Sequence, residues 1–191
     1  MKVIATDIAN LTDARYFAAW GVEAMAYNID SSGSDSLSIA QLKEITDWVE
    51  GPATMIKMEG LAIPDNLEEV NNNLEIHGAI IGPFIEADTL PSFNKVLRIC
   101  TIEDGWQDAN QLILSYPSAI NKASDETKDQ LKSINQGKEV YLDASFSAQD
   151  LDLITSLGFT GIILKGGAEE KVGFKSYEDL DEILETIYDN F

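Results

Sequence analysis

The sequence predicts a small (β/α)8 (TIM) barrel, an α/β fold in which eight strand–helix units close into a ring. Three observations lead to this fold class. Short apolar segments of strand type recur eight times, helical patterns lie between most of them, and the apolar segments are continuous rather than alternating. Continuous apolar strands are typical of parallel sheets, because such strands are buried on both faces.

The strand candidates are short segments bounded by polar or turn-forming residues. They are Val3–Thr6, Met25–Ile29, Thr54–Met58, Ala79–Ile81, Val96–Cys100, Gln111–Leu114, Val140–Leu142 and Gly161–Leu164. A doubly wound open sheet would use the same alternation of strands and helices. Eight units, and the lack of a G-x-G-x-x-G pattern after the first strand, favour the closed barrel.

The helical patterns begin at residues suited to cap a helix. Asn10, Ser38 and Ser124 are predicted N-caps, because their side chains can accept hydrogen bonds from the free N–H groups of the first turn. Glycine follows several of the patterns, where a helix commonly ends. Helices are expected within 10–21, 38–51, 63–74, 124–137, 147–158 and 176–191.

The chain has 191 residues, whereas this fold typically needs ~250. The shortage falls in two connections, 86–93 after the fourth strand and 103–110 after the fifth. Each has room for about two helical turns. We therefore expect the helices after strands 4 and 5 to be shortened or missing. No linker or low-complexity segment interrupts the chain, so we expect residues 1–191 to form a single domain.

The charge of the chain limits its partners. It carries 13 basic and 33 acidic residues, a net charge of -20 at pH 7. Such a surface repels nucleic-acid phosphates and anionic membranes over about a Debye length. No segment approaches the ~18 apolar residues of a membrane span. We expect a cytoplasmic monomer or homodimer that binds no nucleic acid and no membrane, with only local clusters able to hold an anionic metabolite.

Cysteine and histidine are scarce. Cys100 is the single cysteine, so no internal disulfide can form, and His77 is the single histidine. The N-terminus lacks the apolar run of a signal peptide. No CxxC, HExxH or EF-hand pattern is present, so we expect no metal site and no cofactor. His77 precedes the fourth strand, which predicts a place at the barrel end opposite the chemistry.

Polar residues end most of the strands, where the chemistry of this fold takes place. Asp7 and Asp143 follow the first and seventh strands, which only the eighth strand separates on the ring. Two neighbouring carboxylates can divide into a general acid and a general base, so these are the candidate catalytic residues. The predicted substrate pocket also includes Asn28, Lys57 and Arg98.

A pair of glycines, Gly166 and Gly167, follows the eighth strand. Glycines let backbone N–H groups approach an anion closely, and the loops after strands 7 and 8 often bind phosphate in this fold. Spacing alone leaves a phosphate site and a plain turn equally open. The candidate phosphate-binding residues are Ala144, Ser145, Lys165, Gly166 and Gly167.

Both ends of the chain resemble the phosphoribosylanthranilate isomerase family. Residues 10–29, NLTDARYFAAWGVEAMAYNI, are similar to the first helix and second strand of that family, and residues 158–184, GFTGIILKGGAEEKVGFKSYEDLDEIL, to its last strand, loop and closing helix. The resemblance implies a small (β/α)8 barrel that binds a sugar phosphate. It also implies an Amadori rearrangement, an aldose–ketose isomerisation in tryptophan biosynthesis.

The residues that carry the family reaction differ in this chain. The family uses a Cys after the first strand as base, an Asp after the sixth strand as acid, and an Arg to hold the substrate carboxylate. The resemblance places Thr6, Ser115 and Asp35 at these positions. The Thr6 hydroxyl cannot replace the cysteine base near neutral pH, and the Ser115 hydroxyl cannot replace the aspartic acid. Each lost proton-transfer group lowers the reaction rate ~10²–10⁴-fold. The resemblance therefore implies a degenerate active site that keeps a phosphorylated ligand without the isomerase reaction.

Two alternatives remain open. The chain could be an active sugar-phosphate isomerase that uses relocated carboxylates such as Asp7 and Asp143. It could also be a non-catalytic interaction protein, for which the aromatic residues Tyr16, Phe17 and Trp20 of the first helix would supply a contact face. Packing of that helix against the strands explains the same aromatic residues.

Overall fold

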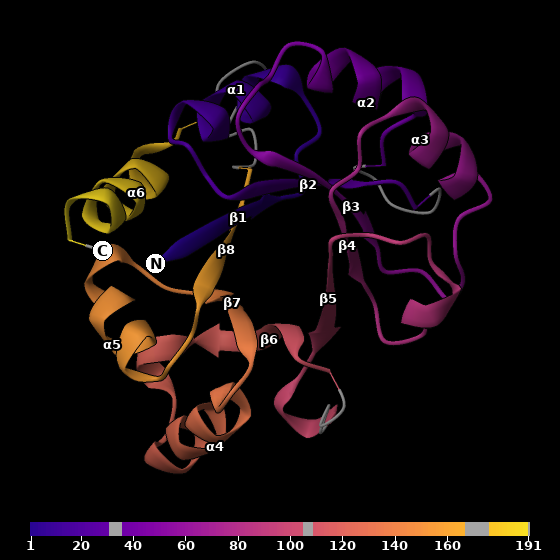
Figure 1. Cartoon of the computed structure of the whole chain (residues 1–191). Helices are drawn as coiled ribbons and strands as arrows, with labels where there is room; N and C mark the ends of the chain where they lie inside the picture. Colours follow the sequence, from indigo (N-terminus) through magenta and orange to yellow (C-terminus); the bar gives the residue numbers. More distant parts are fainter. Residues whose placement is uncertain (31–35, 105–108, 167–175, 191) are drawn as a thin grey trace.

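The strands of this protein close into a barrel. The computed structural model describes residues 1–30, 36–104, 109–166 and 176–190. Eight parallel strands pair in chain order, and the last pairs back to the first, with helices around them (Figure 1). The predicted (β/α)8 fold class is therefore confirmed. The strands are β1 (Lys2–Thr6), β2 (Ala24–Asn28), β3 (Ala53–Met58), β4 (Gly78–Ile81), β5 (Lys95–Cys100), β6 (Gln111–Ala119), β7 (Glu139–Ser145) and β8 (Gly161–Lys165).

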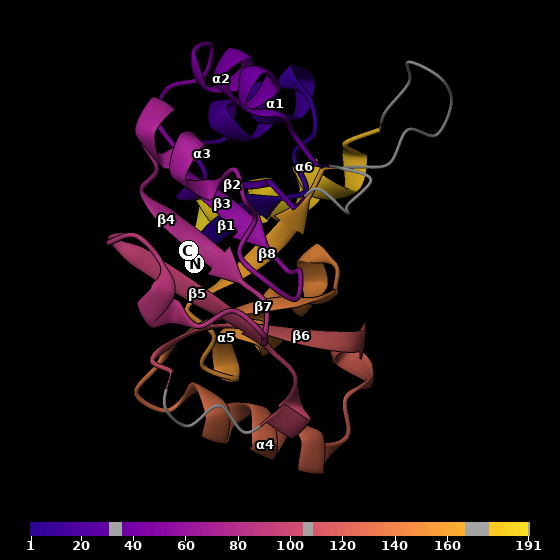
Figure 2. The same cartoon turned by 90° about the vertical axis from the view of Figure 1, so that its right-hand side faces the viewer.

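Helices cover the outside of the barrel unevenly. The α-helices of the described ranges are α1 (Leu11–Ala19), α2 (Ile39–Thr46), α3 (Leu67–Asn73), α4 (Asp125–Asn135), α5 (Leu151–Ser156) and α6 (Glu178–Asn190). From the side, α1 and α2 lie on one flank of the barrel and α4 on the opposite flank (Figure 2). The described residues after β4 and β5 form only short 3-10 turns, Ala87–Thr89 and Ile102–Asp104. The expected shortening of these two helices is confirmed.

The strand alternation divides the core in two. Inside the barrel, small and branched side chains pack around Tyr141, with Ile4, Met55, Ile80 and Leu97 all buried. A larger apolar cluster lies between the outer faces of the strands and the helices. Because both faces of most strands are buried, most of the apolar segments show no alternation, whereas in β5 only Leu97 and Cys100 are buried. No helix among the described residues is long and apolar enough to cross a membrane.

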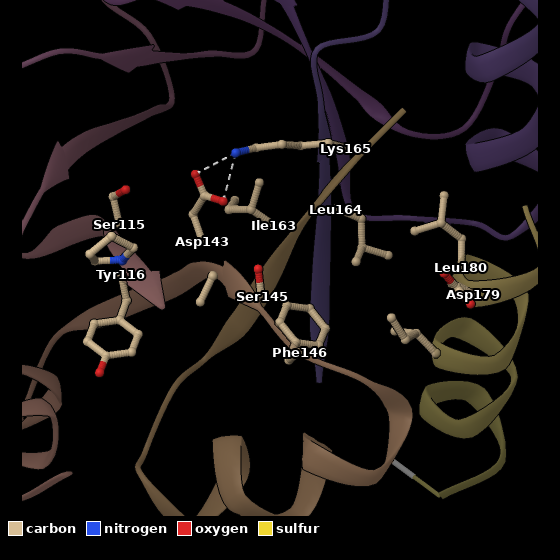
Figure 3. A pocket seen from close by; sticks show the side chains of 13 residues that line it. Ser115, Tyr116, Asp143, Ser145, Phe146, Ile163, Leu164, Lys165, Asp179 and Leu180 are labelled. Atoms are coloured by element: carbon tan, nitrogen blue, oxygen red, sulfur yellow. Dashed lines mark hydrogen bonds and ion pairs between the residues drawn. The ribbon is translucent and has the colours of Figure 1, made fainter. Parts of the chain in front are cut away.

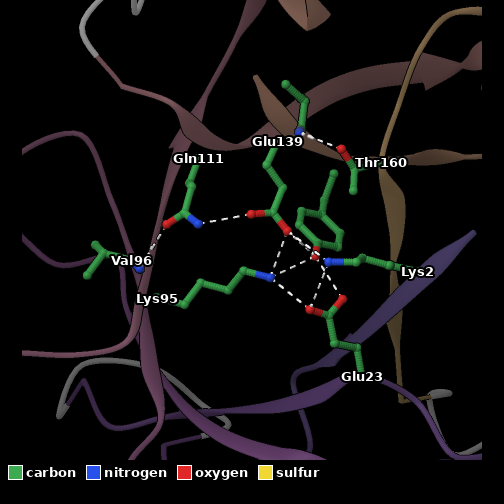
Figure 4. A network of polar contacts seen from close by, with 9 residues as sticks. Lys2, Glu23, Lys95, Val96, Gln111, Glu139 and Thr160 are labelled. Carbon is green, nitrogen blue, oxygen red and sulfur yellow. Dashed lines mark hydrogen bonds and ion pairs between the residues drawn. The ribbon is translucent and has the colours of Figure 1, made fainter. Parts of the chain in front are cut away.

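A network of charged groups fills the barrel at the amino ends of the strands (Figure 4). Lys95 Nζ lies 2.8 Å from Glu23 Oε1 and 2.9 Å from Glu139 Oε1, and Lys2 Nζ lies within 3.4 Å of both carboxylates. The Tyr141 hydroxyl accepts a hydrogen bond from Lys95 and lies within 2.9 Å of each carboxylate. Two ammonium groups and two carboxylates thus offset one another, and the network closes this end of the barrel.

Strand β6 is longer than the sequence predicts. The apolar run ends at Leu114, but the strand continues to Ala119 beside β7, with an irregular register between Ser115 and Ala119. Pro117, which has no N–H group to donate, lies within this irregular part. The extension carries Ser115 and Tyr116 along the rim where the strands end.

Candidate functional site

A pocket of about 500 Å³ opens at the carboxyl ends of β6, β7 and β8 (Figure 3). The first two turns of α6 form its far wall through Leu180 and Ile183, and Phe146 adds an aromatic face. Among the predicted site residues, the pocket is lined by Ser115, Asp143, Ala144, Ser145 and Lys165. The structure therefore brings together the residues predicted after the sixth, seventh and eighth strands.

An ion pair spans this pocket between two neighbouring strands. Lys165 Nζ lies 2.9 Å from Asp143 Oδ1 and donates a 3.0 Å hydrogen bond to Asp143 Oδ2. The Lys165 side chain is 49% exposed, so its ammonium is open to a ligand that enters the pocket. An ammonium carries three N–H donors, so Lys165 has donor capacity beyond its contact with Asp143.

Gly166 continues the chain directly from β8. Its N–H donates to the carbonyl of Thr6 at 3.3 Å, which fixes the end of β8 against the end of β1. A Cβ on Gly166 would lie 2.7 Å from Asp13 Oδ2, so a side chain there would force the buried Asp13 carboxylate to move. Gly166 therefore lets the end of β8 approach α1 closely. Gly167, the second glycine of the predicted phosphate loop, lies outside the described residues.

A second ion pair lies on the same rim, over β1 to β3. Lys57 Nζ donates to Asp7 Oδ1 at 2.8 Å and lies 3.0 Å from Glu59 Oε2. Burial alone would lower the pKa of the Lys57 ammonium, but its hydrogen bonds and attraction to Asp7 and Glu59 outweigh burial and raise that pKa. Lys57 is therefore a fixed cation rather than a neutral, nucleophilic amine.

Asp7 has an unusual backbone conformation for a residue other than glycine. Its φ is 57°, in the left-handed region, which aspartate and asparagine tolerate better than most residues. This turn begins directly after β1 and places the Asp7 carboxylate within reach of Lys57 from two strands away. Asp7 is thus paired with the Lys57 ammonium and not with Asp143, so the predicted catalytic roles of Asp7 and Asp143 stay predictions.

Thr6 ends β1, directly before Asp7. The residue is 2% exposed, and none of the described residues hydrogen-bonds to its hydroxyl. A base would have to take the hydroxyl proton before Thr6 could act on a substrate, and no such contact exists in the described ranges. Ser115, which lines the pocket opposite Asp143 in the strand register, offers a second hydroxyl.

Asn28 and Arg98, which were predicted to line the substrate pocket, hydrogen-bond to loop backbone instead. Asn28 Oδ1 accepts a 2.9 Å hydrogen bond from the Asp30 N–H, which turns the chain after β2. The Arg98 guanidinium hydrogen-bonds to the carbonyls of Gly82, Pro83 and Ile85 in the connection after β4. Arg98 alternates with the inward-facing Leu97, so it lies on the outer face of β5 and away from the barrel mouth.

The sequence did not reveal the contacts that hold α6 beside the pocket. Asp13 of α1 is 2% exposed and accepts hydrogen bonds from Asn10 and Tyr177, and the Tyr16 hydroxyl donates to Asp181 at 2.7 Å. The rings of Tyr16 and Tyr177 stack with centroids 4.0 Å apart. Asp13 resembles an ordinary first-turn acid in the sequence, and only its burial identifies it as a link between α1 and α6.

Other nucleophiles are poorly placed. Burial raises the pKa of the Cys100 thiol to about 11, and Cys100 packs in the outer core cluster. His77 precedes β4, at the opposite end of the barrel from the pocket, as predicted from its position. The described rim therefore offers hydroxyls, ammonium groups and carboxylates, but neither a thiol nor an imidazole. Such a set can bind a polyhydroxylated, charged ligand.

Comparisons with known proteins support the fold. No family model matches the chain, and no curated protein matches it by sequence. Solved structures do match. Phosphoribosylanthranilate isomerase from Thermus thermophilus superposes with a TM-score of 0.75 at 17% identity, covering 99% of each chain. TrpF from Jonesia denitrificans has a TM-score of 0.75 at 15% identity, covering 98% of this chain and 97% of its own.

A third similar structure contains a ligand. It is a phosphoribosylanthranilate isomerase in complex with reduced 1-(o-carboxyphenylamino)-1-deoxyribulose 5-phosphate, with a TM-score of 0.74 at 11% identity and 99% coverage of both chains. Structural matches at such low sequence identity show a shared fold but not a shared activity. The chain thus has the same (β/α)8 barrel fold as the phosphoribosylanthranilate isomerases.

Proposed function

We propose that this chain binds a phosphorylated sugar in the pocket at the ends of β6 to β8, and that it does not catalyse the isomerase reaction. The observation that carries the proposal is the pocket itself, which is about 500 Å³ in volume and has the half-exposed Lys165 ammonium over it. A phosphate is a favoured partner for such an ammonium, because charge-assisted hydrogen bonds are roughly twice as strong as neutral ones.

The remaining lining suits the phosphate end of such a ligand. Ser115 and Ser145 can donate hydrogen bonds to phosphate oxygens, and Phe146 and Leu180 can contact the carbon that carries the phosphate. The similar isomerase structure that holds a phosphorylated, substrate-like compound supports the same class of ligand. Asp143 and Asp179 are the unfavourable elements: the Asp143 carboxylate competes with a phosphate for Lys165, and Asp179 adds a second negative charge to the lining.

The arrangement of the carboxylates argues against catalysis. Two carboxylates that share a proton must lie in contact, as in paired-acid active sites. Here Asp7 hydrogen-bonds to Lys57, and Asp143 to Lys165. Each carboxylate is thus engaged by its own ammonium. With hydroxyls at Thr6 and Ser115, the described rim lacks a matched acid and base for moving a carbon-bound proton.

Calorimetric titration with ribose 5-phosphate tests the binding proposal. Lys165→Met should weaken binding about 10–100-fold, the range expected for a lost hydrogen bond to a charged group. Lys43→Met is the matched control, because Lys43 is also about half exposed and paired with an aspartate, Asp47, but lies on α2. Asp143→Asn should strengthen binding, since it frees the ammonium. Absence of binding to the wild-type chain would refute the proposal.

An isomerase assay tests the second part. The wild-type chain should not convert phosphoribosylanthranilate above the uncatalysed rate. Conversion that is abolished by Asp7→Asn or Asp143→Asn would instead establish an isomerase with relocated carboxylates. The binding titration and this assay are independent, so the two parts of the proposal can fail separately.

A further inference from the structure

The second ion pair lies beside the proposed phosphate pocket, on the same rim. Thr6 of β1 is the register partner of Lys165 in β8, and Asp7 follows Thr6. Neighbouring strands are about 4.8 Å apart, so a five-carbon chain that starts at Lys165 can reach Asp7. A sugar phosphate held at Lys165 would therefore extend toward Asp7, Lys57 and Glu59.

The charge that such a ligand meets there is negative. The Lys57 side chain is only 11% exposed, whereas the side chains of Asp7 and Glu59 are 27% and 50% exposed. The ammonium thus lies beneath the two carboxylates. Asp30 adds a third carboxylate close behind them, where it accepts a 2.9 Å hydrogen bond from the Gly60 N–H.

The two carboxylates are held in place from below. Lys57 binds both of them, and the Asp30 carboxylate accepts hydrogen bonds from the N–H groups of Glu59 and Gly60. Their remaining oxygen lone pairs can accept hydrogen bonds from hydroxyl or ammonium groups of a ligand. Thr6, which directly precedes Asp7, adds a buried hydroxyl to which no described residue hydrogen-bonds.

A ligand with a carboxylate at this end would be repelled. The compound bound in the similar isomerase carries a carboxyphenylamino group at the carbon farthest from its phosphate. We infer that the sugar phosphate of this chain carries a hydroxyl or amino group at its end away from the phosphate, and no carboxylate, and that Asp7 and Glu59 recognise that end. This inference depends on the proposed function and specifies its ligand class.

Three ligands that differ only at carbon 1 test the inference. They are ribitol 5-phosphate, with an alcohol; 1-amino-1-deoxyribitol 5-phosphate, with an ammonium; and ribonate 5-phosphate, with a carboxylate. Their dissociation constants are measured by calorimetry at one ionic strength. We expect the ribonate to bind at least about tenfold more weakly than the ribitol, and the amine to bind at least as tightly, because like charges in contact are penalised.

Variants then assign the discrimination to the two carboxylates. Asp7→Asn keeps a residue that tolerates the left-handed conformation, and Glu59→Gln keeps the side-chain shape. The double variant should bind the three ligands within about threefold of one another. Glu126→Gln with Asp129→Asn is the matched control, since it removes the same charge from exposed positions on α4 and should leave the tenfold preference unchanged.

The possible failures are distinguishable. If the ribonate binds as tightly as the ribitol, the inference is wrong, while the phosphate pocket stands. If the preference exists but survives the double variant, Asp7 and Glu59 do not recognise carbon 1, and the inference is again wrong. If none of the three ligands binds to the folded wild-type chain, the proposed function itself fails.

Discussion

Glu139 lies among the charged groups at the amino ends of the strands. Burial would raise the pKa of its carboxyl, but hydrogen bonds from Lys95, Tyr141 and Gln111 and the charge of Lys95 outweigh burial, and the pKa falls to about 2. The pKa of the Tyr141 hydroxyl is raised, mainly by burial and further by the carboxylates of Glu23 and Glu139. Single residues at this end of the barrel thus contribute to stability, whereas those at the other end are available for binding.

Substitution of Glu139 should change the acid stability of the protein. A lowered pKa in the folded state stabilises the protein above the unfolded-state pKa, and that contribution is lost as the pH falls from about 4.5 to about 2. Glu139→Gln should reduce the free energy of unfolding by up to about 3 kcal/mol at pH 7 and much less near pH 2. Urea unfolding at both pH values measures the difference. An equal loss at both would contradict this role.

At the scale of elements, closure of the barrel depends on a glycine at the start of β8. Gly161 pairs with Lys2 of β1, and a Cβ added to Gly161 would lie 2.3 Å from the Lys2 carbonyl oxygen and 2.8 Å from the Tyr141 ring. The carbonyl belongs to the backbone of the neighbouring strand, so it cannot rotate away. The close approach lets Tyr141 fill the barrel interior.

Gly161→Ala should therefore destabilise the protein by about 3 kcal/mol or more, at the upper end of the cost of overpacking. Gly137→Ala is the comparison: Gly137 has a φ of 72°, but a Cβ added there would meet no atom within 4 Å, so only backbone strain of about 1 kcal/mol applies. Thermal unfolding of both variants measures the difference. If both variants lost the same stability, the close approach of β8 to β1 would not account for the effect of Gly161→Ala.

Element boundaries and caps were largely predictable, because they depend on neighbouring residues. Asn10, Ser38 and Ser124 each accept the predicted N-cap hydrogen bond, from Asp13, Gln41 and Thr127 respectively. The missing helices followed from the spacing of the strands alone. Local signals of this kind need no knowledge of which face of a strand is inside.

The geometry of the site was less predictable. Lys57 and Asp7 are 50 residues apart, and Lys165 and Asp143 are 22 apart, so no local pattern links them. Arg98 was expected at the mouth but lies on the outer face of β5, which is only partly buried and where the connection after β4 offers its carbonyls to the guanidinium. The site residues were predicted by type and strand end, whereas their pairing depends on closure of the barrel.

At the scale of the whole molecule, acidic groups outnumber basic groups by 33 to 13. Self-repulsion among the excess carboxylates opposes the compact state, and salt screens it. The barrel rim has the same imbalance, since each described ammonium there is matched or outnumbered by carboxylates. Charge on this scale limits which ligands can approach and how stable the folded chain is.

The melting temperature should therefore rise as sodium chloride is increased from low concentration to about 0.5 M, where the Debye length falls well below 10 Å. Differential scanning calorimetry at fixed pH measures the shift, and glucose at matched osmolality serves as the uncharged control. A fall in the melting temperature with salt would mean that the ion pairs outweigh the net repulsion.

The most direct measurement for the proposed function is a crystal structure of the chain with ribitol 5-phosphate. We expect the phosphate within hydrogen-bonding distance of Lys165 Nζ, at about 3 Å, in the pocket between β7, β8 and α6, with carbon 1 directed toward Asp7 and Glu59. A ligand bound elsewhere, or a pocket that stays empty at saturating ligand while the Asp143–Lys165 ion pair remains intact, would contradict the proposed function.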